Sequence, residues 1–241
     1  GTASKDVTTG SAPPPPAEYE VIFAGDSITA AGTTPAGSAT GPSNPDGGLK
    51  YALTSQWATT FFVHSSGDWK YSTNVGVSGE NTTQLLARID SITALDGNMI
   101  ACMSGTNDVG QGVPVETTKS NWTAIAAAVL SAGKRLFIFP CAYTNYVGQP
   151  VDALTTYDEI NAHLLTIANG SDDIAIAAIP AEFNALITSN TVDFGRVSYD
   201  GTHLTNFGGM LRGKNSHSAL DAWAPSTRTK SNIIPPFSDT L

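Results

Sequence analysis

The sequence is poor in charged residues and has no long apolar run. Charged side chains make up 14% of its 241 residues, and the formal net charge is −9. Binding to the phosphates of nucleic acids requires a basic face, which an acidic chain of this kind does not offer. A membrane-spanning helix needs about 18 consecutive apolar residues, and the sequence contains no such run. The composition therefore argues against a nucleic-acid partner and against membrane insertion.

Cysteine is also scarce, and the two that occur lie outside any metal-ligand pattern. Cys102 and Cys141 each sit in or just after an apolar, strand-like run, where an unpaired thiol is typically buried. We expect two buried free thiols, because a disulfide would require the two strands to be neighbours. The sequence has no His-Glu-x-x-His segment and no Cys/His cluster either. We therefore expect neither a metal nor another cofactor.

Proline and small polar residues concentrate at the two ends of the chain. Residues 1–17 combine Gly, Ser, Thr and Ala with four consecutive prolines, which is typical of an extended spacer. Residues 224–241 contain three prolines and show no helical period. We predict a linker over 1–17, one globular domain over 18–223 and a C-terminal tail over 224–241. This organisation suggests a module of a longer polypeptide.

Between these spacers, short apolar segments alternate with longer helical ones. Strands are predicted over 20–25, 72–77, 98–103, 135–140 and 173–179. Helices are predicted over 48–63, 81–94, 115–132, 152–169 and 205–223. Nearly continuous apolar strands separated by helices indicate a parallel sheet covered on both faces. We therefore predict a three-layer α/β/α domain with five parallel strands, in which Gly133 ends the third helix.

Four short segments carry polar residues after predicted strands. They are Gly25-Asp26-Ser27-Ile28, Ser78-Gly79, Gly105-Thr106-Asn107-Asp108 and Asp200-Gly201-Thr202-His203. The carboxyl ends of parallel strands meet at one edge of a sheet, and α/β folds build their sites there. The predicted topology therefore brings all four segments to the same edge.

These segments contain the residue types that activate a hydroxyl group. Ser27 would attack an acyl carbon while His203 accepts its proton, and Asp200 would orient the imidazole and stabilise its charged form. The developing oxyanion needs donors that are already in place. The backbone N–H of Ser27, the backbone N–H of Gly79 and the side-chain amide of Asn107 are the candidates.

Each candidate also has an ordinary structural interpretation. Gly-Asp-Ser and Asp-Gly are common turn sequences, and Asn107 could cap the turn after the third strand. Ser27 alone would be weak evidence of catalysis, whereas four segments in a consistent topological order favour it. Asp26 and Asp108 are expected to brace their loops without reacting.

In this order, the four segments resemble the SGNH hydrolase superfamily, which includes the GDSL-type esterases and lipases. The resemblance covers most of the predicted domain, and it departs from the family's name only in having isoleucine where GDSL has leucine. It implies a flavodoxin-like α/β/α fold and a triad of Ser27, His203 and Asp200. It also implies an oxyanion hole formed by Ser27, Gly79 and Asn107.

The first nine residues are similar to a segment that recurs in bacteriophage and prophage tail-fibre proteins. This similarity, a polar segment over 30–47 and a content of only three methionines favour the removal of O-acetyl groups from a carbohydrate. An acetylated glycan or a small ester is then the expected partner, and an extracellular or virion-associated location is expected. A lipase, lysophospholipase or thioesterase of the same superfamily is the alternative. A non-catalytic glycan-binding tail module is the alternative from another class.

Overall fold

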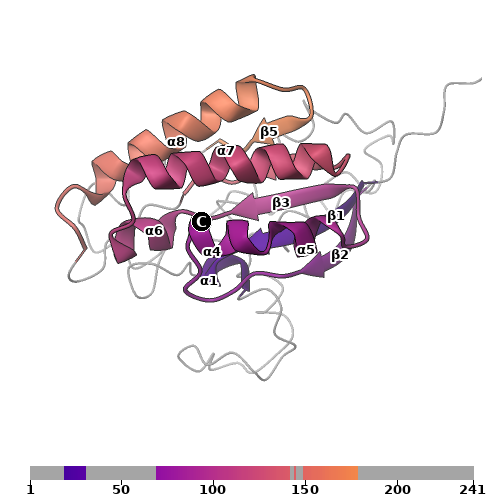
Figure 1. Cartoon of the computed structure of the whole chain (residues 1–241), viewed down its shortest axis with the longest axis horizontal. Helices are drawn as coiled ribbons and strands as arrows, with labels where there is room; N and C mark the ends of the chain where they lie inside the picture. The colour runs from indigo at the N-terminus through magenta and orange to yellow at the C-terminus, as the bar shows by residue number, and fades with distance from the viewer. Residues whose placement is uncertain (1–18, 31–68, 142–143, 145–148, 179–241) are drawn as a thin grey trace, which may run out of the picture.

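The computed structural model of the chain describes residues 19–30, 69–141, 144 and 149–178, and its strands form a single sheet (Figure 1). The strands are β1 (Tyr19–Gly25), β2 (Trp69–Asn74), β3 (Met99–Met103), β4 (Arg135–Ile138) and β5 (Ile174–Ile176). Their order is β2-β1-β3-β4-β5, and every neighbouring pair is parallel. This is the flavodoxin-like strand order. The predicted α/β fold with five parallel strands is confirmed.

In the described part of the chain, four helices supply most of the helical side chains that pack against one face of the sheet (Figure 1). They are α4 (Thr82–Ala87), α5 (Ile89–Thr93), α7 (Val115–Ser131) and α8 (Ala153–Asn169). The short helix α1 (Ser27–Ala30) contributes Ile28 to the core on the opposite face. The helices predicted over 48–63 and 205–223 lie outside the described residues.

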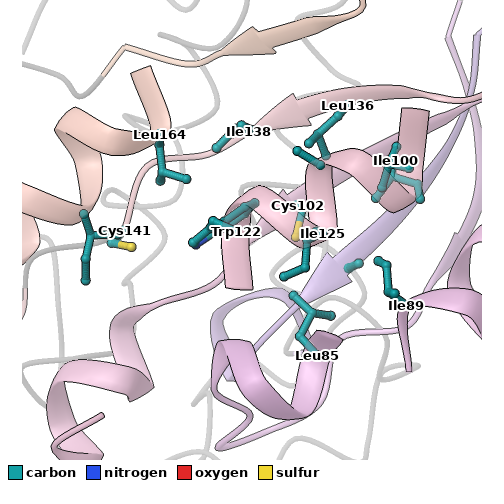
Figure 2. Close-up of a cluster of buried hydrophobic side chains, with 14 of the residues drawn as sticks. Leu85, Ile89, Ile100, Cys102, Trp122, Ile125, Leu136, Ile138, Cys141 and Leu164 are labelled. Carbon is teal, nitrogen blue, oxygen red and sulfur yellow. The ribbon is translucent and has the colours of Figure 1, made fainter. Parts of the chain in front are cut away.

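The central strand β3 is apolar and buried throughout, and β1 is so from Val21 onward, because both faces of the sheet are buried there. In β1, Ile22 and Ala24 join the helix-covered cluster, whereas Val21 and Phe23 belong to the cluster on the other face. Figure 2 shows the first cluster, in which the fully buried Trp122 of α7 lies among side chains from β3, β4 and α8. Successive strand residues point to opposite faces, so burial on both sides produces an unbroken apolar run.

Both cysteines are free and buried. Cys102 lies in β3 and belongs to the helix-covered cluster, and the Cys141 thiol donates a hydrogen bond to the carbonyl of Ser104 at 3.0 Å. The expectation of two buried free thiols is confirmed.

The predicted helix over 81–94 was wrong in one respect, because the chain breaks it in two at Arg88. This residue leaves the helical conformation, with φ −114° and ψ 8°. Its guanidinium reaches back to the buried carboxylate of Glu80, with Nε–Oε1 and Nη2–Oε2 distances of 2.6 Å. An ion pair across eight residues is a tertiary contact that helical periodicity does not reveal.

Further boundaries differ from the prediction, and the strand predicted over 135–140 is β4, which ends at Ile138. The strand predicted over 72–77 is β2, which starts earlier and ends at Asn74, whose side chain accepts from the N–H of Gly76 at 2.9 Å. The last strand, predicted over 173–179, is the three-residue β5. The short helix α6 (Thr106–Gln111) was not predicted, because it has no apolar period and lies between Gly105 and Gly112.

The end of α7 agrees with the prediction for Gly133. This glycine has a φ of 70°, and its N–H donates to the carbonyl of Leu130 at 2.9 Å. The N–H of Lys134 donates to the carbonyl of Val129 at 3.2 Å. These two bonds form a Schellman motif, which satisfies the last carbonyls of the helix and turns the chain into β4.

None of the helices in the described ranges has the length and hydrophobicity that crossing a membrane requires.

Candidate active site

The first site segment is fixed where β1 ends against β3. Gly25 has a φ of 141°, and a Cβ at this position would lie 2.0 Å from the carbonyl oxygen of Met103. Only glycine permits both this conformation and this approach. Asp26 is 1% exposed, and its Oδ1 accepts from the N–H of Ile28 at 2.9 Å, so it braces the turn as expected. Ser27 lies within this turn, between Asp26 and Ile28, and is half-buried at the carboxyl end of β1.

The second segment follows β2 and runs directly beside the first. The N–H of Val77 donates to the carbonyl of Gly25 at 2.8 Å. The amide of Asn74 donates to the carbonyl of Thr29 at 2.8 Å. A Cβ on Gly76 would lie 2.5 Å from the backbone nitrogen of Ala30, so the two backbones are in close contact. Sheet pairing and these bonds therefore place the Ser78-Gly79 segment next to Ser27.

Gly79 presents a backbone donor on an open surface. It is exposed, has a φ of 77°, and a Cβ built on it would meet no atom within 4 Å. Within the described part of the chain, its N–H has no hydrogen-bond acceptor. The turn is closed by the N–H of Glu80, which donates to the carbonyl of Val77 at 3.2 Å. A ligand atom could therefore reach the Gly79 N–H.

The third segment, in α6, is bonded to the second. The amide nitrogen of Asn107 donates to the carbonyl of Glu80 at 2.9 Å. An asparagine amide carries two N–H groups. The second N–H of Asn107 has no acceptor among the described residues. Asn107 and Gly79 thus each offer one unused neutral donor on segments that are hydrogen-bonded together.

Asp108 ties α6 to the helices on either side of it. It is fully buried, and its carboxylate accepts from the N–H of Thr82 at 2.9 Å and from the hydroxyl of Thr118 at 3.0 Å. The hydroxyl of Thr82 donates to it as well. This pattern agrees with the expectation that Asp108 orders the segment.

The thiol of Cys102 lies in the strand next to the Ser27 segment, but it is unsuited to nucleophilic chemistry. Burial raises its pKa far above the ordinary value, and the Coulombic effect of Asp26 raises it further. A protonated, buried thiol is inert. Among the described residues, no three His, Cys, Asp or Glu side chains form a group that could hold a metal ion.

The structure therefore brings the Ser27, Gly79 and Asn107 segments together at the carboxyl edge of β1, β2 and β3. Asp200 and His203 lie outside the described residues, so their predicted meeting with Ser27 stays a prediction. Sequence reasoning did not single out Gln111, which contacts the Gly79 loop. Its spacing of four residues from Asn107 would have been a signal, had α6 been predicted as a helix.

Comparisons with known proteins agree with the family that the sequence motifs resemble. The chain matches the GDSL-like Lipase/Acylhydrolase family over residues 23–209. No curated protein matches it. A solved structure described as a GDSL-like lipase from Parabacteroides merdae is 17% identical, with a TM-score of 0.65 over 85% of this chain and 96% of that one. The acetylxylan esterase Axe2 from Geobacillus stearothermophilus is 17% identical, with a TM-score of 0.63 over 88% and 96%. The α/β hydrolase LAE5 from the metagenome of Lake Arreo, Spain, is 17% identical, with a TM-score of 0.63 over 88% and 98%. These likenesses show a shared fold.

Proposed function

Since the chain belongs to the GDSL-like lipase/acylhydrolase family, we propose that it is a serine esterase that removes O-acetyl groups from a carbohydrate. Ser27 is the nucleophile in this proposal. His203 is the general base, and Asp200 fixes the tautomer of His203 and stabilises its charged form. Membership of the family places the chain among hydrolases of ester bonds, whereas the residue roles and the acetylated substrate are the proposal.

The first half of the reaction transfers the acetyl group to the enzyme. The Ser27 Oγ attacks the carbonyl carbon of the ester while His203 takes the hydroxyl proton. The carbonyl oxygen becomes an oxyanion, which accepts from the backbone N–H groups of Ser27 and Gly79 and from the Asn107 amide. The bond between the acyl carbon and the sugar oxygen then breaks. His203 returns its proton to that oxygen, and the sugar leaves as an alcohol.

The second half releases the acetyl group as acetate. His203 takes a proton from a water molecule, and the resulting hydroxide attacks the acetyl carbon of the acyl-enzyme. The same donors hold the second oxyanion. The bond between the acyl carbon and the Ser27 oxygen breaks, and His203 returns the proton to Ser27. Asp200 stays ionised throughout.

The observation that supports this proposal most directly is the pair of unused donors beside the Ser27 segment. The Gly79 N–H and the second Asn107 N–H have no acceptor in the described part of the chain. Both are neutral, so neither competes with a histidine for the serine proton. Donors fixed before the reaction stabilise an oxyanion without reorganising when its charge develops, and enzymes of this kind usually owe more of their rate enhancement to such stabilisation than to any other effect.

Three features support an acetylated carbohydrate as the substrate. The segment over 30–47 is rich in Gly, Pro, Ser and Thr, the chain has only three methionines, and its first nine residues are similar to a tail-fibre segment. The fold is also shared with an enzyme named as an acetylxylan esterase. A lipase, lysophospholipase or thioesterase remains the alternative within the family. Rates on p-nitrophenyl esters from acetyl to octanoyl separate the two, because a rise with chain length would favour the lipid enzymes.

The proposal is tested by hydrolysis of p-nitrophenyl acetate by the wild type and by Ser27→Ala. We expect Ser27→Ala to lower turnover by at least about 10³-fold, because members of a triad act as a unit. His203→Ala should lower it by a similar factor. Ser131→Ala is the matched control, since Ser131 is exposed at the end of α7 that leads into the amino end of β4.

Equal rates in the wild type and Ser27→Ala would remove Ser27 from the mechanism. If the wild type binds an acetylated polysaccharide and hydrolyses neither that polysaccharide nor the small ester, the non-catalytic glycan-binding module becomes the better explanation. Release of acetate from the polysaccharide by the wild type alone would support the esterase.

A further inference from the structure

The position of Gly79 is not fixed by packing. The residue is exposed, and nothing lies within 4 Å of the place where a side chain would begin. A glycine whose side-chain position meets no packing neighbour has access to a broad range of backbone conformations. The Gly79 N–H must point in the right direction before the oxyanion forms, and an unpacked glycine does not fix that direction by itself. Hydrogen bonds to the neighbouring peptide groups must therefore restrain it.

Gln111, the last residue of α6, supplies one of these bonds. Its amide nitrogen donates to the carbonyl of Gly79 at 2.8 Å. Its amide oxygen accepts from the side chain of Asn81 at 2.8 Å. Because its oxygen and its nitrogen are both engaged, the amide of Gln111 is held in one orientation.

Asn81 is itself fixed by the start of α4. Its Oδ1 accepts from the N–H of Gln84 at 3.1 Å, and its own N–H donates to the Gln84 side chain at 3.0 Å. This is a capping box, which holds the first turn of a helix. Gln111 therefore connects the Gly79 carbonyl to a rigid helix start.

The peptide group that follows Gly79 is held at both ends. Its carbonyl accepts from Gln111, and its N–H, which belongs to Glu80, donates to Val77. The next carbonyl, of Glu80, accepts from Asn107. Two successive carbonyls of the loop thus accept from residues four apart on α6, which lie on one face of that helix. Fixing this peptide group limits rotation about the backbone torsions of Gly79, and it thereby restrains the direction of the Gly79 N–H.

We propose that Gln111 is a positioning residue that holds the Gly79 N–H in the direction an oxyanion requires. This inference rests on the proposed esterase function. Gln111 acts only through the Gly79 carbonyl, so its loss weakens a donor without removing it. Removal of an oxyanion-hole donor costs about 10²–10³-fold in kcat. We expect a smaller effect from Gln111, of about 10- to 100-fold.

The test compares Gln111→Met with Gln111→Lys on p-nitrophenyl acetate. Methionine keeps the length of the side chain but makes neither hydrogen bond. Lysine restores a donor for the Gly79 carbonyl alone. We expect kcat and kcat/KM of Gln111→Met to fall by the same factor with KM unchanged, as for an interaction made only in the transition state. Gln111→Lys should recover most of this loss, and the recovery should persist at high salt, which screens the added charge.

Gly133→Ala is the matched control for a merely structural role. It strains the left-handed backbone after α7 but leaves the bonds of Gln111 to Asn81 and Gly79. We expect it to lower the melting temperature without changing kcat. Gln111→Met should lower kcat and leave the melting temperature nearly unchanged. Gln111 is exposed, so its hydrogen bonds compete with water and add little stability.

A second readout is the inhibition constant of phenylboronic acid, which forms a tetrahedral adduct with an active-site serine. The inhibition constant should rise in Gln111→Met by about the factor by which kcat falls. An unchanged kcat and inhibition constant in Gln111→Met would overturn the positioning role, and so would a loss of kcat that Gln111→Lys does not restore. If Ser27→Ala keeps the wild-type rate, the esterase function itself fails. If Ser27→Ala is inactive and Gln111→Met is fully active, only the inference about Gln111 fails.

Discussion

At the scale of single residues, Cys102 links packing to the response of the chain to pH. The thiol is 1% exposed in the helix-covered core, and burial followed by the Coulombic effect of Asp26 raises its pKa. The folded chain therefore keeps this proton at a pH where the unfolded chain releases it. Its contribution to stability is complete below the ordinary thiol pKa of 9.0 and is lost as the pH rises above it.

We predict that Cys102→Ala flattens the alkaline loss of stability. In the wild type, this one group should add a slope that approaches roughly 1.4 kcal/mol per pH unit above the ordinary thiol pKa. The variant lacks that slope, although the cavity it leaves lowers its stability at every pH. Urea unfolding at a series of pH values from neutral to alkaline measures both slopes. Identical slopes would show that the thiol ionises equally in the folded and unfolded chains.

At the scale of elements, two glycines are needed for different reasons. Gly133 is needed for its backbone conformation, and Gly76 is needed because the space beside it is occupied. Gly133 adopts a φ of 70° after α7, and a Cβ there would meet nothing within 4 Å. Gly76 has no positive φ, but a Cβ there would lie 2.5 Å from the backbone nitrogen of Ala30. An alanine at the first position is strained without a clash, and an alanine at the second clashes with backbone that cannot move away cheaply.

We predict that Gly133→Ala lowers the free energy of unfolding by about 1–2 kcal/mol, the cost of the left-handed conformation for an L-residue. Gly76→Ala should lower it by more and should also reduce esterase activity, because it separates the Ser78-Gly79 segment from α1. Chemical denaturation and p-nitrophenyl acetate turnover measure the two effects. A larger loss of activity in Gly133→Ala than in Gly76→Ala would contradict this assignment.

The elements also show how far the sequence predicts this molecule. The strands β1, β3 and β4 were found because burial on both faces makes them nearly continuously apolar, and α7 was found together with its terminal glycine. The break at Arg88 accompanies an ion pair with Glu80, and Asn74 at the end of β2 donates to the distant carbonyl of Thr29, so helical and strand periodicity could not reveal these boundaries. The motif residues Ser27, Gly79 and Asn107 were recognised by their types. Gln111 was not, because its part in the site depends on a helix that has no apolar period.

At the scale of the whole molecule, the domain boundaries stay a prediction. We expect a chain of residues 18–223 to keep its fold and its esterase activity, because the predicted domain includes all five strands and all the proposed site residues. Circular dichroism, thermal unfolding and turnover, compared with those of the full chain, measure this. A truncated chain that is unfolded or inactive would show that one of the predicted spacers belongs to the domain.

The strand order has a consequence for how this molecule can change. β1, which leads to Ser27, lies between β2 and β3, and these neighbours lead to Gly79 and Asn107. The spacing of adjacent strands, about 4.8 Å, is a constant of backbone pairing that side-chain substitutions barely alter. The spacing among the Ser27, Gly79 and Asn107 segments is thus inherited from the sheet. Substitutions elsewhere in the chain could therefore change which esters are recognised while the nucleophile segment and its two oxyanion donors keep their relative positions.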